Sequence, residues 1–380
     1  MRLLLLSLSG LLLTGLLIYL FVNFGTGDKK VNEISVASIM SGEVSGFKKA
    51  DSIRQFIFPK DHFAHNEYRT EWWYFTGNLF TQEGRRFGYQ FTIFRNGILP
   101  GSESDSVVIS QNSLYSIHIG ISDIQNQKFY SYERYARALD GLAGSDETAK
   151  RIYIEGNEIL FDFSNGAELP GFQVNSSTDD FKISFNLVPE KKMVLHGDKG
   201  LSKKSNKPGN ASYYYSFTKL NTGGELTLQG EKFKLNGSSW MDREWSTSAL
   251  ESDQKGWDWF ALQMEDGTEL MYFRLRDSTG STNFQKGTLI QMDGSYDVFT
   301  GNDFKITPLQ NAEIDGIKYP VEWEIKIIPL NFVFGVSVAM KNQVHPFRLR
   351  YYEGAINAFR KSGNEISKGV GYVELTGYGD

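Results

Sequence analysis

Residues 71–95 read EWWYFTGNLFTQEGRRFGYQFTIFR, and this stretch predicts a β-hairpin. A tryptophan-rich strand leads into a turn at Gln82–Gly84, after which residues 87–93 alternate aromatic or aliphatic side chains with small or polar ones. A period of two is typical of a strand that packs one face against a core, and glycine beside polar residues is typical of a turn. The stretch therefore favours antiparallel β-structure.

A second stretch, residues 256–276, repeats the same order of features and reads GWDWFALQMEDGTELMYFRLR. Each stretch has a tryptophan-rich strand, an acidic-glycine turn, and a second strand that carries a tyrosine and ends in arginine. Two related hairpins in one chain predict two related domains. The length of 380 residues points the same way, because it exceeds what one ordinary core organises.

The composition also favours strands and tight turns over helices, with 28 Phe, 19 Tyr and 38 Gly against 9 Pro. We predict an all-β protein of two tandem lipocalin-like antiparallel β-barrel domains, at residues 67–235 and 236–380. Further strands are predicted at Ile152–Glu155, Ile159–Phe163, Phe181–Leu187, Tyr213–Leu220 and Glu225–Leu228, and only Glu133–Leu142 looks helical. Residues 31–66 form a linker that leads into the first domain.

The first thirty residues differ from the rest of the chain. Arg2 precedes an apolar run from Leu3 to Phe24, and at about 1.5 Å per residue such a helix can span a bilayer. The run is long for a cleavable signal peptide, although Gly25 and Gly27 are small enough for a cleavage site. We therefore predict an extracytoplasmic protein, periplasmic or secreted, anchored in the membrane by residues 3–24, with cleavage as the alternative.

Several classes of function are excluded by what the sequence lacks. There is no cysteine, so disulfides and thiol catalysis are ruled out. A net charge of −5 without a basic tract is unlike a nucleic-acid-binding protein. The sequence contains no HExxH, phosphate-binding, dinucleotide-binding or GxSxG motif. We predict no cofactor.

His62 and His65, with Glu67 and Glu71 nearby, are the only candidates for a metal site that the sequence offers. Imidazole and carboxylate suit zinc or iron, but two histidines and scattered acids in a loop are a weak pattern. We predict no metal site here. We instead expect two hydrogen-bonding histidines that fasten the linker to the first barrel.

The segment Trp240–Trp245 is the densest in residues that carry chemistry. In an extended strand Arg243 and Trp245 share one face, while Asp242 and Glu244 share the other. In the second hairpin Tyr272 and Arg274 share a face in the same way. The alternative is structural: the tryptophans fill a core, and the arginines are paired with carboxylates such as Asp242 or Glu244.

Four longer segments carry a family resemblance: FPKDHFAHNEYRTEWWYFTGNL (58–79), VLHGDKGLSKK (194–204), ASYYYSFTKL (211–220) and GSSWMDREWSTSAL (237–250). In this order they resemble the carotenoid 1,2-hydratase-like (AttH-type) family, a lipocalin-related family whose exported members are often labelled predicted secreted hydrolases. The resemblance covers nearly the whole chain after residue 50. It implies two lipocalin-like β-barrel domains in tandem, as the repeat does.

The resemblance also implies positions for the hydratase machinery, in which an acid protonates a carbon–carbon double bond and water captures the cation. The family tryptophan and tyrosine fall at Trp245 and Tyr272. The histidine and aspartate positions hold Arg243 and Arg274, and arginine is a poor proton donor or acceptor near neutral pH. Two of the four parts are therefore absent, and the hydration activity is not carried over.

Three functions remain open. The first is a lipocalin-like protein that binds an elongated apolar ligand, such as a lipid or isoprenoid, with an anionic headgroup held by arginines. The second is an enzyme that acts on such a ligand as a hydratase, isomerase, cyclase or hydrolase. The third is a structural accessory in a complex with a membrane transporter.

The candidate residues follow from these hypotheses. For ligand binding they are Glu71, Trp73, Arg243, Trp245, Trp257, Trp259, Tyr272 and Arg274. For catalysis they are Asp242, Glu244, Trp245 and Tyr272, with Glu71 as a further candidate acid.

Overall fold

The computed structural model describes residues 46–100, 112–248, 250–251 and 253–379. All of them belong to one compact unit, Ser35–Asp380. The predicted membrane anchor at residues 3–24 lies outside the described residues. Within the described ranges, no helix is both long enough and apolar enough to cross a bilayer.

The first of two antiparallel sheets in the described chain contains thirteen strands, in the order β4-β3-β2-β1-β13-β12-β9-β8-β7-β6-β5, with β10 and β11 also paired to β12. Their bounds are β1 (Thr70–Phe80), β2 (Arg86–Gly97), β3 (Ser113–Asp123), β4 (Lys128–Arg137), β5 (Ala143–Asp146), β6 (Arg151–Ile154), β7 (Asn157–Asp162), β8 (Gly171–Ser177), β9 (Phe181–Pro189), β10 (Val194–Leu195), β11 (Leu201–Lys203), β12 (Ala211–Leu228) and β13 (Glu231–Ser248).

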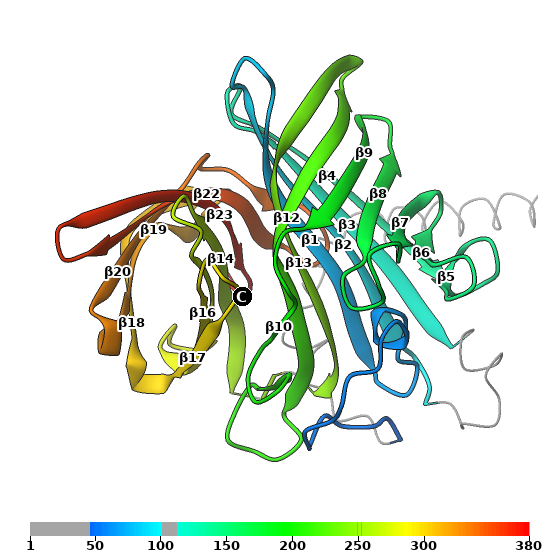
Figure 1. Ribbon diagram of the computed structural model, residues 1–380, viewed down its shortest axis with the longest axis horizontal. Helices are drawn as coiled ribbons and strands as arrows, with labels where there is room; N and C mark the ends of the chain where they lie inside the picture. Colours follow the sequence, from blue (N-terminus) through cyan, green and yellow to red (C-terminus); the bar gives the residue numbers. More distant parts are fainter. Residues whose placement is uncertain (1–45, 101–111, 249, 252, 380) are drawn as a thin grey trace, which may run out of the picture. The chain divides into compact units, whose positions relative to one another are not determined.

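The second sheet has ten strands in the described chain, in the order β17-β16-β15-β14-β23-β22-β20-β19-β18, with β21 paired to β22. Figure 1 shows these strands curling around an interior in a barrel-like arrangement. Their bounds are β14 (Gln254–Met264), β15 (Glu269–Asp277), β16 (Thr282–Ile290), β17 (Tyr296–Thr300), β18 (Phe304–Ile314), β19 (Ile317–Ile327), β20 (Phe332–Val338), β21 (Val344–His345), β22 (Tyr351–Ser362) and β23 (Glu365–Leu375). The described helices are the 3-10 turns η1 (Lys60–His62), η2 (Gly301–Asp303) and η3 (Ile328–Leu330).

The structure confirms the all-β prediction and both hairpins that the repeat identified. The first is β1 paired with β2, and the second is β14 paired with β15. The weak helix at 133–142 is wrong, because its first half belongs to β4, which pairs with β3 along its length, and its second half forms turns. Residues 128–137 read KFYSYERYAR, and the tyrosines Tyr130 and Tyr132, two apart, pack against the core of the first sheet as the period of a strand requires.

The predicted domain join between residues 235 and 236 falls inside β13, which pairs with β1 and β12. The two sheets instead divide between Ser248 and Gln254. Gly237, beside this predicted join, packs closely within the sheet: a Cβ there would lie 2.2 Å from the backbone oxygen of Asn78. The placement of the domains themselves stays a prediction.

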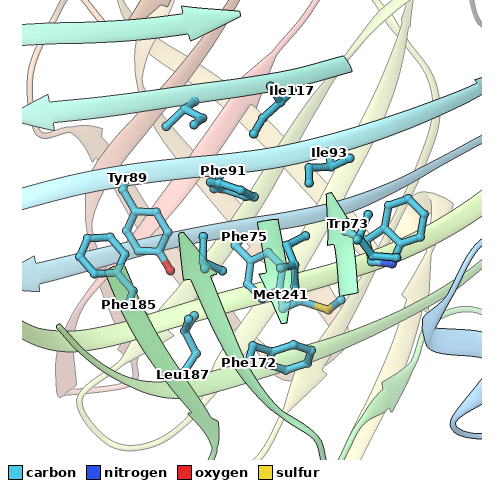
Figure 2. Close-up of a cluster of buried hydrophobic side chains, with 14 of the residues drawn as sticks. Trp73, Phe75, Tyr89, Phe91, Ile93, Ile117, Phe172, Phe185, Leu187 and Met241 are labelled. Atoms are coloured by element: carbon cyan, nitrogen blue, oxygen red, sulfur yellow. The ribbon is translucent and has the colours of Figure 1, made fainter. Parts of the chain in front are cut away.

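Each sheet encloses its own apolar core, and a third apolar cluster joins the two sheets. Figure 2 shows the first core, where side chains including Phe75, Phe91 and Phe172 point toward one another from different strands. The joining cluster includes Tyr74 and Trp240 from the first sheet with Trp259 from the second, among other buried residues. The central strands are therefore buried on both faces, which makes the space between the sheets an interior site.

Candidate functional site

A cavity of about 320 Å³ lies between the two sheets. Residues that line it from the first sheet include Trp72, Tyr74, Phe94, Tyr214, Asp242 and Glu244. Residues that line it from the second sheet include Trp257, Trp259, Phe273, Leu275, Tyr351 and Glu374. The lining is thus mostly aromatic and aliphatic, with a few acidic groups, as is usual for small-molecule sites.

The period of two in the central strands creates this lining. In β1, Thr70, Trp72 and Tyr74 face the cavity, and the residues between them face the core of the first sheet. Strand β13 pairs with β1 so that Asp242 lies opposite Tyr74 and Glu244 lies opposite Trp72. The two acids therefore enter the cavity wall beside two large aromatic side chains.

Asp242, one of the acids in the cavity wall, accepts three side-chain hydrogen bonds. Its Oδ2 accepts a hydrogen bond of 2.5 Å from the Tyr214 hydroxyl, and its Oδ1 accepts one of 2.6 Å from Trp240 Nε1 and another from Ser216. Burial raises the pKa of Asp242 to about 7, against the opposing effect of these hydrogen bonds. The charge of Glu244 adds to the increase, so Asp242 is a proton donor near neutral pH.

Glu374 on β23 is a second acid of this kind, and it lies directly opposite Glu353 on β22. Burial, together with the nearby charges of Asp242 and Glu244, raises the pKa of Glu374 to about 8. Burial also raises the pKa of Glu353 well above its usual range, and the Tyr74 hydroxyl donates a 2.5 Å hydrogen bond to its Oε1. Opposed carboxylates repel each other when ionised, so this pair favours protonated acids.

Glu244, by contrast, has a cationic partner. Lys204 Nζ lies 2.7 Å from Glu244 Oε1, and the same ammonium is 4.5 Å from the ring centre of Phe273 and 5.3 Å from that of Tyr214. Both members of the ion pair are buried. The wall of the cavity therefore already binds one alkylammonium group between a carboxylate and two aromatic faces.

His118 lines another part of the cavity together with Tyr351. Its Nδ1 is 2.9 Å from the Tyr351 hydroxyl, and its Nε2 is 3.5 Å from Glu133 Oε2. Burial lowers the pKa of His118 to about 3, so the ring is neutral at physiological pH. It therefore adds no positive charge to the cavity.

The comparisons with known proteins agree with this two-sheet arrangement. A family model described as AttH-like matches residues 49–378. The chain belongs to the AttH-like family. A search of curated protein sequences finds no match.

Among solved structures, an AttH protein from Nitrosomonas europaea is 28% identical to this chain, with a TM-score of 0.77 over 87% of this chain and 100% of that one. Kievitone hydratase from Nectria haematococca is 16% identical, with a TM-score of 0.67 over 87% of this chain and 96% of its own. The structure of CghA with Sch210972 is 11% identical, with a TM-score of 0.53 over 89% and 97%. The last two share the fold.

The sequence-predicted site residues fall into three places in this AttH-like chain. Asp242, Glu244, Trp257 and Trp259 line the cavity between the sheets. Glu71, Trp73, Arg243 and Trp245 lie in the interior of the first sheet, and Tyr272 and Arg274 lie in that of the second. The four positions that the resemblance assigned to hydratase machinery therefore do not converge on one site.

Inside the first sheet, Glu71 is held by two arginines. Arg95 and Arg243 each form an ion pair with it, and all three side chains are fully buried. Burial alone raises the pKa of Glu71, but the two positive charges outweigh it and hold the pKa well below its usual range. The rings of Trp245 and His65 stack with their centres 3.9 Å apart, and the His65 ring also contacts Glu71.

The second sheet repeats this arrangement. Asp258 accepts from Arg274 at 2.7 Å and from Arg276 at 2.9 Å, and the Tyr378 hydroxyl donates to it at 3.0 Å. Each sheet thus buries one carboxylate between two arginines, although in the first sheet one of the arginines, Arg243, comes from β13 and not from the hairpin. The structural alternative named Asp242 or Glu244 as partners of the arginines, whereas the partners are Glu71 and Asp258.

The linker histidines have the fastening role that the sequence predicted. His62 Nδ1 is 2.6 Å from the Tyr215 hydroxyl, and its Nε2 is 2.7 Å from the backbone oxygen of Ala167. His65 Nε2 lies 3.0 Å from Asp61. No cluster of three or more metal-ligating side chains occurs within the described residues.

Sequence reasoning missed Glu374, Tyr74, Tyr214 and Lys204 as members of the site. Glu374 carried a usable signal, since an acid between Val373 and Leu375 on a strand indicates a polar group facing away from the core. The others are set by contacts between distant segments, such as the hydrogen bond from Tyr214 to Asp242. Local patterns do not encode such contacts.

We predict that Arg243→Met destabilises the protein by about 3–5 kcal/mol, because it leaves the buried Glu71 with one arginine fewer. Chemical unfolding of the variant measures this loss. Arg134→Met is the matched control: Arg134 pairs with Glu155 on the surface, and its loss leaves stability nearly unchanged. A variant of unchanged stability that no longer binds ligand would instead give Arg243 a recognition role.

We also predict that the stability gained by Asp242→Asn over the wild type grows as the pH rises. The carboxyl has a folded pKa of about 7 against 3.8 when unfolded, so folding opposes its ionisation and the wild type loses stability across this window. Asparagine stays neutral and avoids the loss. Urea unfolding at about pH 5 and about pH 8 measures the difference, and Asp297→Asn, on the surface, serves as control. A difference that is independent of pH would contradict the raised pKa.

Proposed function

We propose that the protein binds an apolar small molecule in the cavity between its two sheets. The observation that carries this proposal is the lining itself: side chains of Trp72, Trp257, Trp259, Phe94 and Phe273 surround a cavity of about 320 Å³. Burying apolar ligand surface against such walls contributes roughly 25 cal/mol per Å². A few hydrogen-bonding groups among the aromatic rings then orient the ligand.

A ligand site between the sheets is also favoured over a ligand site inside either sheet. Arg243 and Arg274, which the sequence analysis assigned to an anionic headgroup, each have a buried carboxylate partner and lie outside the cavity lining. The interiors of both sheets are filled by their own side chains, among them Trp73 and Trp323. Close packing of that kind leaves the space between the sheets as the place for a ligand.

Nile red, a neutral apolar dye whose fluorescence rises in apolar surroundings, tests this proposal. We expect the purified protein to bind it, and Leu275→Trp to reduce the affinity by about tenfold or more, because the larger ring occupies the cavity. Leu309→Trp is the matched control, since Leu309 is exposed on the second sheet. Equal binding by all three proteins would place the dye elsewhere and overturn the proposal.

A second candidate function is acid catalysis on the bound molecule, and Asp242 favours it. Its protonated carboxyl can transfer a proton to a carbon–carbon double bond, which leaves a carboxylate on the protein and a cation on the ligand. Aromatic faces such as that of Trp259 stabilise a cation. Water can then add to the cation and lose a proton to the Asp242 carboxylate, or a neighbouring carbon can lose a proton to it, and either step restores the acid. Kievitone hydratase shows that a hydratase exists on this fold.

Deuterium exchange tests the catalytic candidate. Any compound that organic extraction releases from the purified protein is returned to it in D₂O, and its mass is followed with time. We expect deuterium to enter at carbon with the wild type and the rate to fall by about a hundredfold or more in Asp242→Asn, which keeps the shape but loses the acid. Exchange at the same rate in both proteins would exclude Asp242 as the acid.

A further inference from the structure

One end of the cavity gathers acids around aromatic side chains. Asp242 and Glu374 line this end with Tyr74, Tyr214 and Trp259, and these five residues are called here the acidic end. Trp259 lies opposite Glu374 across β14 and β23, and its ring centre is 5.2 Å from that of Tyr74. The charges of Asp242 and Glu244 contribute to the raised pKa of Glu374.

Basic groups are placed away from the acidic end or are already paired. Lys204 is bound to Glu244, and His118 is neutral because of burial. Arg69 also lines the cavity, but its backbone lies five residues before that of Tyr74, a separation of roughly 17 Å at about 3.4 Å per residue. The ion pairs among the described residues give neither Asp242 nor Glu374 a lysine or arginine partner.

Lys204 shows what this lining can hold. Its ammonium lies between Glu244 and the rings of Phe273 and Tyr214, in the same cavity wall. The acidic end offers the same combination of carboxyl groups and aromatic faces. The two groups share Tyr214, whose ring centre is 5.3 Å from the Lys204 ammonium, but within the described chain no lysine or arginine forms an ion pair with Asp242 or Glu374.

Buried carboxyl groups with no cation nearby stay protonated, because ionisation in an apolar cavity is costly. One oxygen of Glu353, which lies opposite Glu374 across β22 and β23, has no hydrogen-bond partner among the described residues. A positive charge placed beside these groups stabilises their ionised form over their protonated form. It allows a carboxyl group to ionise, and the aromatic faces add their own attraction for a cation.

We propose that the acidic end binds a positively charged group, so that the ligand of the cavity is an apolar molecule that carries an ammonium group. The proposal rests on the cavity being the ligand site and adds the charge of the ligand. It gives the ligand a cationic headgroup, whereas the sequence analysis expected an anionic one. The arginines that suggested an anion, Arg243 and Arg274, pair with carboxylates inside the sheets and do not line the cavity.

Three molecules of similar size and different charge test the proposal: phenethylammonium, 2-phenylethanol and 3-phenylpropionate. Calorimetric titration of the purified protein at about pH 7 measures each affinity. We expect phenethylammonium to bind about tenfold more tightly than 2-phenylethanol, and 3-phenylpropionate to bind more weakly than both. Titrations in buffers of different ionisation enthalpy should show that the ammonium, and not the alcohol, releases protons on binding.

The variant Asp242→Asn/Glu374→Gln removes both ionisable groups from the acidic end and keeps their shapes. We expect it to lose the preference for phenethylammonium over 2-phenylethanol, and to lose the proton release. Glu265→Gln/Asp297→Asn makes the same two changes on the surface and should behave as the wild type.

The outcomes separate the two proposals. Equal affinity for the ammonium and the alcohol, both lost in Leu275→Trp, would overturn the charge preference and leave the cavity as the ligand site. A preference that survives in Asp242→Asn/Glu374→Gln would show that the cation binds elsewhere. Failure of all three molecules and of Nile red to bind would overturn both proposals.

Discussion

The burial of the central strands on both faces is the constraint on which the rest of the structure depends. One face of β1 closes the core of the first sheet, and the other face packs against the second sheet, so that nearly every residue of the strand is buried. Strand β9, which lies away from the second sheet in the strand order, alternates regularly between buried and exposed residues. A doubly buried strand has no solvent-facing position for a charged residue, so each charge on it needs a partner or must be neutralised.

Buried acidic residues are accommodated differently on the two faces of the central strands. Toward the core of each sheet, a carboxylate lies between two arginines, as Glu71 and Asp258 do. Toward the space between the sheets, Asp242 and Glu374 have no arginine, and burial raises the pKa of both instead. Both arrangements occur within residues 242–244 of β13, because Arg243 lies on the face opposite to Asp242 and Glu244. The ionised clusters give rigidity, and the protonated ones leave reactive groups beside a cavity.

The sequence was enough to predict several strands of the first sheet, both hairpins, the family and the division of residues 242–245 between two faces. It did not say which face meets a cavity, because alternation shows only that two faces differ. With both faces buried, Arg243 and Trp245 were as good a choice for a ligand site as Asp242 and Glu244. The partners Glu71 and Asp258, the pair Glu353 and Glu374, and the contact of Tyr74 with Glu353 all depend on the pairing of distant strands.

The same physical arrangement connects the binding protein and the acid catalyst as candidate functions. Because burial and not a fixed arginine sets the protonation of Asp242, the occupant of the cavity decides what this carboxyl group does. A neutral apolar ligand leaves it protonated and able to donate a proton. A ligand with an ammonium group draws the proton off and converts it into a counter-ion. A cation formed on the ligand by proton transfer and an ammonium group that a ligand carries into the cavity therefore have the same surroundings. A stable ammonium compound that binds there should inhibit any reaction that forms such a cation as an intermediate.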